Sequence, residues 1–181
     1  MTHVLLGVSG GIAAYKAADL VSRLVKADCA VRVVMTPSAT RFVTPLTFEA
    51  MSGHPVMVDA LATAGSGATS AVEHVDWAKW AHKAVVAPCT ANTLAKLAVG
   101  LADDALSTVF LALPRGVPTW VCPAMNTAMW KHPTVERNLR WLDELGHCEI
   151  IAPTAKRLAC GDVGVGGLAE VDDIVSAVLS G

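Results

Sequence analysis

Short apolar runs rich in valine and isoleucine alternate along the chain with longer segments of helical periodicity, and this alternation constrains the fold most. The apolar runs are residues 3–8, 30–35, 83–88, 117–123 and 148–153. The helical patterns are residues 13–27, 44–51, 91–100, 103–113, 125–146 and 172–180. Alternation of this kind is typical of βαβ units, and parallel strands buried on both faces have such continuous apolar sequences. The sequence therefore predicts a single α/β domain over residues 1–181, a doubly wound parallel sheet between two helical layers.

The composition argues against several classes of function. The formal net charge is −2 and the pI is near 6.3, so we expect neither nucleic acid nor an anionic membrane as a partner. No apolar run reaches the roughly 18 residues of a membrane helix, and the first run lacks the basic lead of a signal peptide. The cysteines form no CxxC pair and no zinc-like spacing with histidine. We expect a cytoplasmic protein with reduced thiols and no bound metal.

Polar residues that follow the predicted strands are the first candidates for a site, because ligands bind at the carboxyl ends of parallel strands. Gly10 and Gly11 follow the first strand and allow a tight turn into a helix N-terminus that can bind an anion. The pattern is neither GxGxxG nor a Walker loop. The second strand ends in Thr36-Pro37-Ser38, without the acidic residue that binds ribose in dinucleotide folds.

Further hydroxyl and amide groups follow residues 83–88, where Thr90, Asn92 and Thr93 begin the next helical pattern. Such groups gathered from several strand ends suit one phosphate with its polar tail, and so favour a mononucleotide such as FMN over NAD. The alternative is that each residue only caps a helix, a position where Ser, Thr and Asn are common.

Several motifs occur together in the order and spacing of one family. They are SGGIAAYK, HVDWAKWA, APCTANTLAKLAVGLADD, PAMNTAMW and KRLACGD. On these motifs nearly the whole chain resembles the homo-oligomeric flavin-containing cysteine decarboxylases, whose fold is Rossmann-like or flavodoxin-like. PAMNxxMW with a downstream ACGD is specific to the family, whereas the glycine turn is not.

The resemblance implies FMN as the cofactor and assigns roles to individual residues. The implied flavin contacts are Gly10, Gly11, Ile12, Thr36, Ser38, Thr90, Ala91, Asn92, Thr93 and Ala124. The expected substrate contacts are Asn126, Met129, Arg157 and Ala159, with Asn126 at the substrate carboxylate and Arg157 a candidate for its phosphate. His74 and Cys160 are the implied catalytic residues, and residues 154–169 the implied flap over the substrate.

The residue types alone leave alternatives open. His74 could be a base or a positioning group, but a surface or hydrogen-bonded histidine is the simpler interpretation. Asn126 can donate two N–H groups to a carboxylate and could also cap the following helix. The methionines Met125 and Met129 suit packing. Cys160 differs from Cys29, Cys89, Cys122 and Cys148 because it lies in a glycine-rich segment near the basic Arg157, which favours function.

The implied reaction is decarboxylation of 4′-phospho-N-pantothenoylcysteine to 4′-phosphopantetheine in coenzyme A biosynthesis. Oxidation of the CH2–SH group by FMN would give a thioaldehyde, from which carbon dioxide leaves to form a delocalised enethiolate. Return of a hydride and a proton would complete the saturated thiol, and Cys160 is the implied late proton donor.

Three other functions remain as alternatives. A decarboxylase of a peptide's C-terminal cysteine stops at the enethiol and needs no returning acid, so ACGD argues against it. A non-catalytic flavin-binding regulatory subunit that inhibits a phosphatase usually carries long acidic tails. A flavin prenyltransferase shares the scaffold but is not expected to carry both PAMNxxMW and ACGD.

The resemblance also implies homotrimers, or homododecamers of four trimers, with FMN at a subunit interface, and a hydrophobic content of 53% agrees. Bacterial relatives often continue into a synthetase domain, whereas this sequence ends after its last predicted helix, so we expect either a monofunctional decarboxylase or an isolated domain. Gly167 and Leu168 stand where many relatives have other residues. The contacts that the flap makes with the substrate are therefore not assigned from the resemblance.

Overall fold

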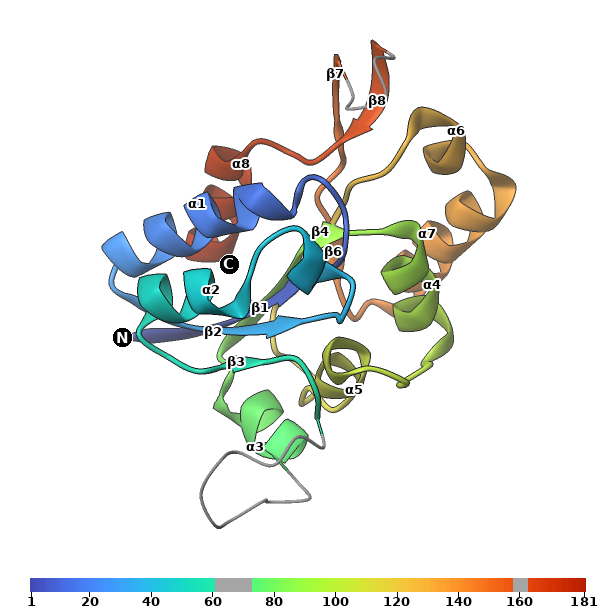
Figure 1. Ribbon diagram of the computed structural model, residues 1–181. Coiled ribbons are helices and arrows are strands. Elements are labelled where there is room, and N and C mark those ends of the chain that lie inside the picture. Colours follow the sequence, from blue (N-terminus) through green and yellow to red (C-terminus); the bar gives the residue numbers. More distant parts are fainter. Residues whose placement is uncertain (61–72, 158–162) are drawn as a thin grey trace.

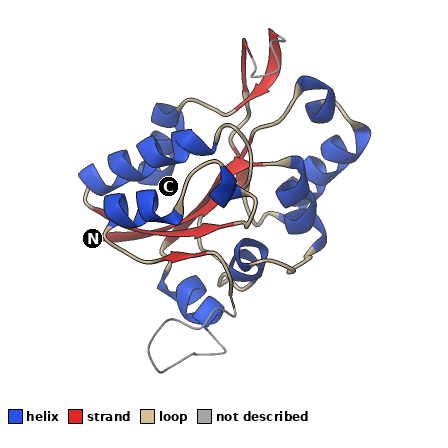
Figure 2. Ribbon diagram, viewed as in Figure 1, coloured by secondary structure: helices blue, strands red, loops and turns tan. Residues whose placement is uncertain are grey.

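A parallel β-sheet lies between two layers of helices in the computed structural model, which describes residues 1–60, 73–157 and 163–181 (Figure 1, Figure 2). The strands of this sheet, in their spatial order, are β3 (Val56–Met57), β2 (Cys29–Met35), β1 (Thr2–Val8), β4 (Lys83–Cys89), β5 (Thr119–Pro123) and β6 (Glu149–Ile150). Every pairing in the sheet is parallel. The predicted three-layer, doubly wound α/β fold is confirmed.

The helices divide between the two faces of the sheet (Figure 1). The first face is covered by α1 (Ala14–Lys26), α2 (Pro45–Ser52) and α8 (Val171–Ser180). The second face is covered by α3 (Glu73–Trp80), α4 (Ala91–Val99), α5 (Ala105–Leu111) and α7 (Pro133–Leu145). Two short helices, η1 (Ala39–Arg41) and α6 (Thr127–Trp130), follow strand ends, and β7 (Thr154–Arg157) pairs with β8 (Val163–Gly167) in a separate antiparallel hairpin.

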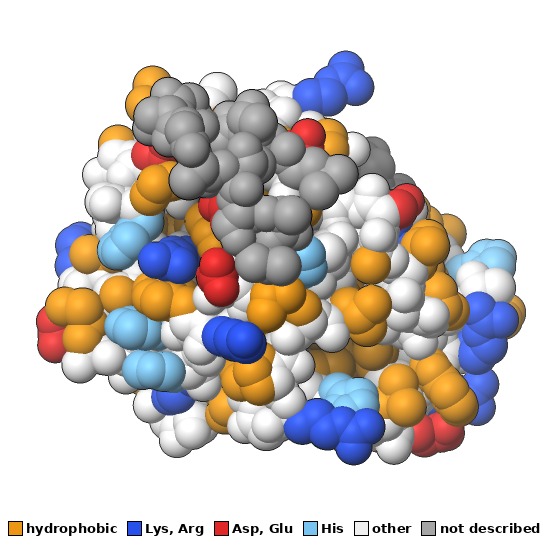
Figure 3. Space-filling view, turned by 90° about the horizontal axis from the view of Figure 1, so that it is seen from below, with side chains coloured by type: hydrophobic (Ala, Val, Ile, Leu, Met, Phe, Trp, Pro, Cys, Tyr) orange, Lys and Arg blue, Asp and Glu red, His pale blue; other side chains and the backbone are white. Residues whose placement is uncertain are grey.

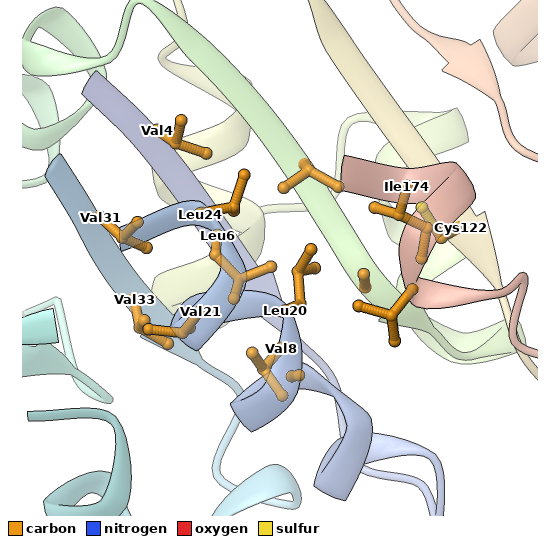
Figure 4. Packing of buried hydrophobic residues seen from close by; sticks show 14 of the residues in the cluster. Val4, Leu6, Val8, Leu20, Val21, Leu24, Val31, Val33, Cys122 and Ile174 are labelled. Carbon is orange, nitrogen blue, oxygen red and sulfur yellow. The ribbon is translucent and has the colours of Figure 1, made fainter. Parts of the chain in front are cut away.

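The packing between β1 and α1 shows why the alternating sequence forms this fold. Alternate β1 residues, Val4, Leu6 and Val8, point toward Leu20 and Leu24 of α1, and all five are at most 1% exposed (Figure 4). The helical residues recur at the spacing of one amphipathic face. Each such side chain contributes about 1.5–3 kcal/mol on burial, so this interface is a main source of stability.

The order of the strands places a crevice at the centre of the sheet. From β1 the chain moves outward through β2 and β3, and from β4 it moves outward the other way through β5 and β6. The connections after the neighbouring strands β1 and β4 therefore diverge onto opposite faces of the sheet. Ligands of open α/β sheets bind at such a switch point, outside the carboxyl ends of the strands.

The predicted single helix over residues 125–146 is wrong. The structure divides it into α6 and α7, and His132 between them is extended, with φ −71° and ψ 132°. Pro133 explains the division, because proline lacks an N–H group and disfavours helical geometry in the residue before it. Pro133 instead takes the first position of α7, and the His132 side chain accepts the N–H of Thr134 (3.3 Å).

The described surface has a mixed character. Seen from below, positive and negative side chains are dispersed among apolar and neutral ones, with several histidines (Figure 3). Within residues 1–60, 73–157 and 163–181, no helix has the length and apolar content needed to cross a membrane. In the same ranges, no group of three or more His, Cys, Asp or Glu side chains is arranged to hold a metal ion.

Candidate flavin site

Three of the predicted flavin-binding segments meet beyond the carboxyl ends of β1, β2 and β4. Gly10 packs so tightly on the second segment that an added Cβ would collide with the Cβ of Ser38 and lie 2.7 Å from its carbonyl carbon. Gly11 faces the third segment, where an added Cβ would lie 3.5 Å from Cγ2 of Thr90. Gly10 therefore lets the first two segments approach each other, as expected of glycine at a close backbone contact, whereas a Cβ at Gly11 would make only ordinary van der Waals contact with the third segment.

The second segment is fixed by its own hydrogen bonds. The backbone N–H of Thr36 donates to the carbonyl of Val8 (3.0 Å), which ties the end of β2 to the end of β1. The Thr36 hydroxyl is buried and accepts the N–H of Ala39 (3.3 Å). Thr36 therefore orients the turn that carries the exposed Ser38.

The third segment forms the N-terminus of α4. The Thr90 hydroxyl caps the helix by accepting the N–H of Thr93 (3.4 Å), and the two hydroxyls are 3.3 Å apart. Thr93 is only 1% exposed, so its hydroxyl serves the cap. Because the first amides of a helix have no partner within it, the N–H groups of Ala91 and Asn92 are the donors that this end offers to a ligand.

These segments fit the phosphate and polar chain of FMN. They contain hydroxyl, amide and glycine groups and no carboxylate between residues 9–12, 36–38 and 90–93. The N-terminus of α1 has no side-chain cap, but the N–H groups of Ala14 and Lys16 already donate to the carbonyls of Gly11 (2.9 Å) and Ala13 (3.0 Å). Ile12, which is 60% exposed, lies beside this end and offers an apolar surface to a flavin ring.

Asn126 lies on the next strand end and has its expected capping role. Its Oδ1 accepts the N–H of Ala128 (2.7 Å) at the start of α6. The preceding Ala124 donates its N–H to the carbonyl of Cys89 (2.9 Å), which ties this loop to the end of β4. The half-exposed Met129 lies on α6 three residues after Asn126. The loop thus holds Asn126 next to the flavin-binding segments.

The predicted flap is a hairpin that rests on the Asn126 loop. The N–H of Met125 donates to the carbonyl of Gly166 in β8 (2.8 Å). At Gly166, with φ +147°, an added Cβ would collide with the carbonyl oxygen of Met125, and at Gly164 it would lie 2.5 Å from Oγ1 of Thr127. That Thr127 hydroxyl is buried without a hydrogen-bond partner among the described groups. Two glycines of the flap are therefore required by close contact.

His74 does not join these residues within one chain. It is the second residue of α3, which packs on α5 and β1, whereas the hairpin and α6 lie at the other end of the view (Figure 1). His74 is half-buried, and its Nδ1 is buried without a hydrogen-bond partner in the described part of the chain. The alternative interpretation of His74, as a histidine whose ring is hydrogen-bonded within the protein, is therefore not supported at Nδ1.

The four described cysteines have the character of packing residues. Burial raises the pKa of the Cys29, Cys89 and Cys122 thiols, and it raises the pKa of Cys148 to about 11. A thiol with a raised pKa remains protonated and unreactive at neutral pH. Cys160 and Ala159 lie outside the described residues, and Arg157 is placed by its backbone, as the last residue of β7.

A cavity lined by described residues lies elsewhere in the molecule. It has a volume of about 730 Å³ and opens between the carboxyl ends of α4, α5 and α7. Its walls include Phe110, Arg115, Trp120 and Leu142, and none of the candidate flavin or substrate residues. Since it lies at the amino ends of β5 and β6, it is at the wrong end of the sheet for the site described above.

One residue of the site was absent from the sequence-based assignment. The Ser9 hydroxyl is buried between the ends of β1 and β4 and bonds to backbone groups of Pro88 and Thr90. A hydroxyl directly before a glycine pair is a weak signal in a sequence, because its contacts are made to residues far along the chain.

Comparison with known proteins agrees with this architecture. Residues 1–180 match the family described as Flavoprotein, and the chain belongs to that family. It is 50% identical over 173 residues to a coenzyme A biosynthesis bifunctional protein CoaBC of Bacillus subtilis, covering 96% of this chain and 41% of that protein. It is 43% identical over 175 residues to a probable phosphopantothenoylcysteine decarboxylase of Streptococcus mutans, covering 97% of this chain and 96% of that protein.

Solved structures show the same similarity over whole chains. A cysteine-to-serine mutant of a PPC decarboxylase, complexed with pantothenoylaminoethenethiol, is 36% identical with a TM-score of 0.83, covering 99% of this chain and 97% of that one. The FMN binding protein AtHal3 is 37% identical with a TM-score of 0.80, covering 99% and 95%. The chain therefore spans the full length of these proteins but about two fifths of the bifunctional relatives.

Proposed function

We propose that this chain is an FMN-dependent phosphopantothenoylcysteine decarboxylase of coenzyme A biosynthesis. The observation that carries the proposal is the meeting of three flavin-binding segments with the Asn126 loop and its glycine-docked hairpin. Full-length similarity to a probable decarboxylase with this activity supports the choice of substrate. FMN is the cofactor, as in the related FMN binding protein.

Bound FMN supplies the two-electron oxidation and reduction that a simple cysteine carboxylate needs before it can lose carbon dioxide. The residues of the chain bind and orient the reactants. The α4 N-terminus with Thr90, Ala91 and Asn92 holds the phosphate end of the cofactor. The Nδ2 group of Asn126 donates to the substrate carboxylate, since Oδ1 of this amide faces α6. The hairpin of residues 154–169 covers the substrate and excludes water.

His74 reaches the site from a neighbouring copy of the chain. Within one chain α3 lies away from the flavin-binding segments, and the buried Nδ1 of His74 lacks a hydrogen-bond partner among residues 1–60, 73–157 and 163–181. A trimer in which each copy offers α3 to the next would complete the site, and four such trimers would give a dodecamer. His74 would then position the substrate or remove a proton from it.

Cys160 completes the reaction by giving a proton to the enethiolate. The related PPC decarboxylase with a cysteine changed to serine was complexed with pantothenoylaminoethenethiol, an ethenethiol compound. In this chain Cys160→Ser should therefore still release carbon dioxide and accumulate an ethenethiol product. Mass spectrometry of the product tests this, and normal 4′-phosphopantetheine from the variant would remove Cys160 from the mechanism.

The experiment that tests the proposed function compares two substrates. The purified FMN-loaded protein is incubated with 4′-phospho-N-pantothenoylcysteine and, separately, with a peptide that ends in cysteine. We expect carbon dioxide and 4′-phosphopantetheine from the first and no reaction of the second. Turnover of the peptide alone would indicate the peptidyl-cysteine decarboxylase, and flavin binding without turnover of either would favour the regulatory subunit.

The remaining assignments follow from this function. We place the enzyme in the cytoplasm, as one flavoprotein domain over residues 1–181 that acts on a small molecule and binds neither nucleic acid nor membrane. A synthetase activity would supply its substrate.

A further inference from the structure

The Ser9 side chain bridges the two central strand ends of the site. Ser9 is fully buried, and its hydroxyl donates to the carbonyl of Pro88 (2.7 Å). The same oxygen accepts the backbone N–H of Thr90 (2.9 Å). One side chain thus makes both a donor and an acceptor bond to the segment that leads from β4 into α4.

The bridge lies where the regular ladder between β1 and β4 ends. The paired residues run from Val4 with Lys83 to Gly7 with Val86, and the register of β4 against β5 shifts between Val86 and Cys89. Beyond Gly7, the backbone N–H of Ser9 also donates to the Pro88 carbonyl (3.2 Å). The Ser9 hydroxyl therefore replaces the strand hydrogen bonds that the irregular end of β4 cannot make.

The bridge determines the direction of the helix that follows. Thr90 is the N-cap of α4, so its N–H group is the first amide at this end. Because Ser9 accepts this N–H, the amide points into the protein, and the next two amides, of Ala91 and Asn92, are left to face a ligand. A rotation of the Thr90 peptide would turn those two donors as well.

We infer that Ser9 is a positioning residue for the phosphate of FMN and acts through the Thr90 peptide, without contact to the cofactor. The inference rests on the flavin site of the proposed function. In this inference, the two hydrogen bonds of the Ser9 hydroxyl align the amides of Ala91 and Asn92 with the phosphate. Loss of the Ser9 hydroxyl should therefore weaken the binding of the phosphate and leave the binding of the flavin ring unchanged.

The test compares FMN with riboflavin, which lacks the phosphate. The full chain is freed of flavin and titrated with each compound, and the quenching of flavin fluorescence gives the two Kd values. For Ser9→Ala we expect the Kd of FMN to rise about tenfold, because the released Thr90 peptide no longer holds the amides of Ala91 and Asn92 in place, while the Kd of riboflavin stays within about twofold. An equal rise for both flavins, or none for either, would overturn the inference.

Ser107→Ala is the matched control. Ser107 is 2% exposed, and its hydroxyl likewise bridges backbone and side-chain groups, but at the start of α5, away from the flavin-binding segments. It should lose stability in urea unfolding while both Kd values remain those of the parent. The Kd of riboflavin divided by the Kd of FMN should therefore stay constant in this control. If this ratio fell as much in Ser107→Ala as in Ser9→Ala, a specific role of Ser9 would be contradicted.

Ser9→Cys is the second variant, in case Ser9→Ala does not fold. A thiol keeps one donor and one acceptor but bonds more weakly, so the ratio of the two Kd values should fall by less than in Ser9→Ala. An unchanged ratio, or loss of folding in both variants, would reject the inference. None of these measurements uses decarboxylation, so they are independent of the substrate assignment. Equal Kd values for FMN and riboflavin in the parent protein would instead reject the proposed phosphate site at the start of α4.

Discussion

The Asn126 side chain caps a helix and is also the proposed donor to the substrate carboxylate. Its Oδ1 caps α6 through the N–H of Ala128, and this bond fixes which way the other half of the amide points. The two interpretations that the sequence left open, a helix cap and a carboxylate donor, are therefore compatible. The cap is a feature of the structure, whereas the role toward the substrate remains a proposal.

Replacing Asn126 by aspartate separates these functions. Aspartate retains an oxygen that can cap α6, so Asn126→Asp should unfold within about 0.5 kcal/mol of the parent. The added negative charge would repel the substrate carboxylate, and kcat/KM should fall on the order of a hundredfold or more. Steady-state kinetics with urea unfolding measures both effects, and near-normal kcat/KM would contradict the assignment.

Gly166 should not tolerate a side chain. Its φ of +147° and its contact with the Met125 carbonyl leave no room for a Cβ, so Gly166→Ala should displace the hairpin from the Asn126 loop. We expect kcat/KM to fall about tenfold or more, because the hairpin that is proposed to cover the substrate would lose its position on the Asn126 loop. Kinetics measures the effect, and binding of FMN should persist.

The control for this variant is Gly53→Ala. Gly53 also has positive φ (+71°), at the C-terminus of α2, but nothing lies within 4 Å of an added Cβ. It should lose about 1 kcal/mol of stability and keep its kinetic constants. Equal losses of kcat/KM in the two variants would show that the contact with Met125 has no functional effect.

At the scale of elements, the sequence predicted those whose signal is local. The apolar runs at β1, β2 and β4 and the amphipathic face of α1 specify strand and helix within a few residues. Pro133 gave an equally local signal for the break between α6 and α7, and the long helical pattern around it concealed that signal. The β7–β8 hairpin could not be predicted, because its glycines are explained by contact with Met125 and Thr127, about 40 residues away.

The start of α5 provides a pH test at this scale. Burial alone would raise the pKa of Asp104, but hydrogen bonds from Lys96 (2.7 Å) and Ser107 outweigh it and lower the pKa. A lowered carboxyl pKa gives stability that is present above the unfolded value and is lost as pH falls through the folded one. Asp104→Asn should therefore cost about 1–2 kcal/mol at pH 7 and less below about pH 4.

Urea unfolding at pH 7 and at pH 3 measures this difference. Asp103→Asn is the control, since the Asp103 carboxylate also bonds Lys96 but its side chain is 53% exposed, against 10% for Asp104. Its effect should be below about 1 kcal/mol at either pH. A loss for Asp104→Asn that is equal at both values of pH would contradict the role of its charge.

At the scale of the whole molecule, the sequence predicted which segments meet at one edge of the sheet, but it did not predict that α3 lies away from them within one chain. Gly10, Ser38 and Thr90 meet because parallel strands end at one edge of the sheet, which follows from the α/β pattern alone. The position of His74 depends on the packing of α3 against α5, and a motif does not contain that information.

Mixing two inactive variants tests whether copies share a site. His74→Asn and Asn126→Asp chains are each expected to be inactive, and after joint refolding at equal amounts about a quarter of the shared sites would contain both intact residues. We therefore expect about a quarter of the parent activity in the mixture. Activity no higher than that of the separate variants would show that His74 and Asn126 act within one chain.

The separation of α3 from the flavin-binding segments also predicts how defective and normal alleles would act together in one cell, if copies share sites. A chain that lacks His74 but assembles normally would occupy a place beside an intact chain and leave that neighbour's site without its histidine. The defective chain's own site would in turn receive an intact histidine from its neighbour, so each defective chain removes one site and the total output falls only by its share. A His74 allele and an Asn126 allele expressed in one cell should therefore complement each other in part, whereas two His74 alleles should not.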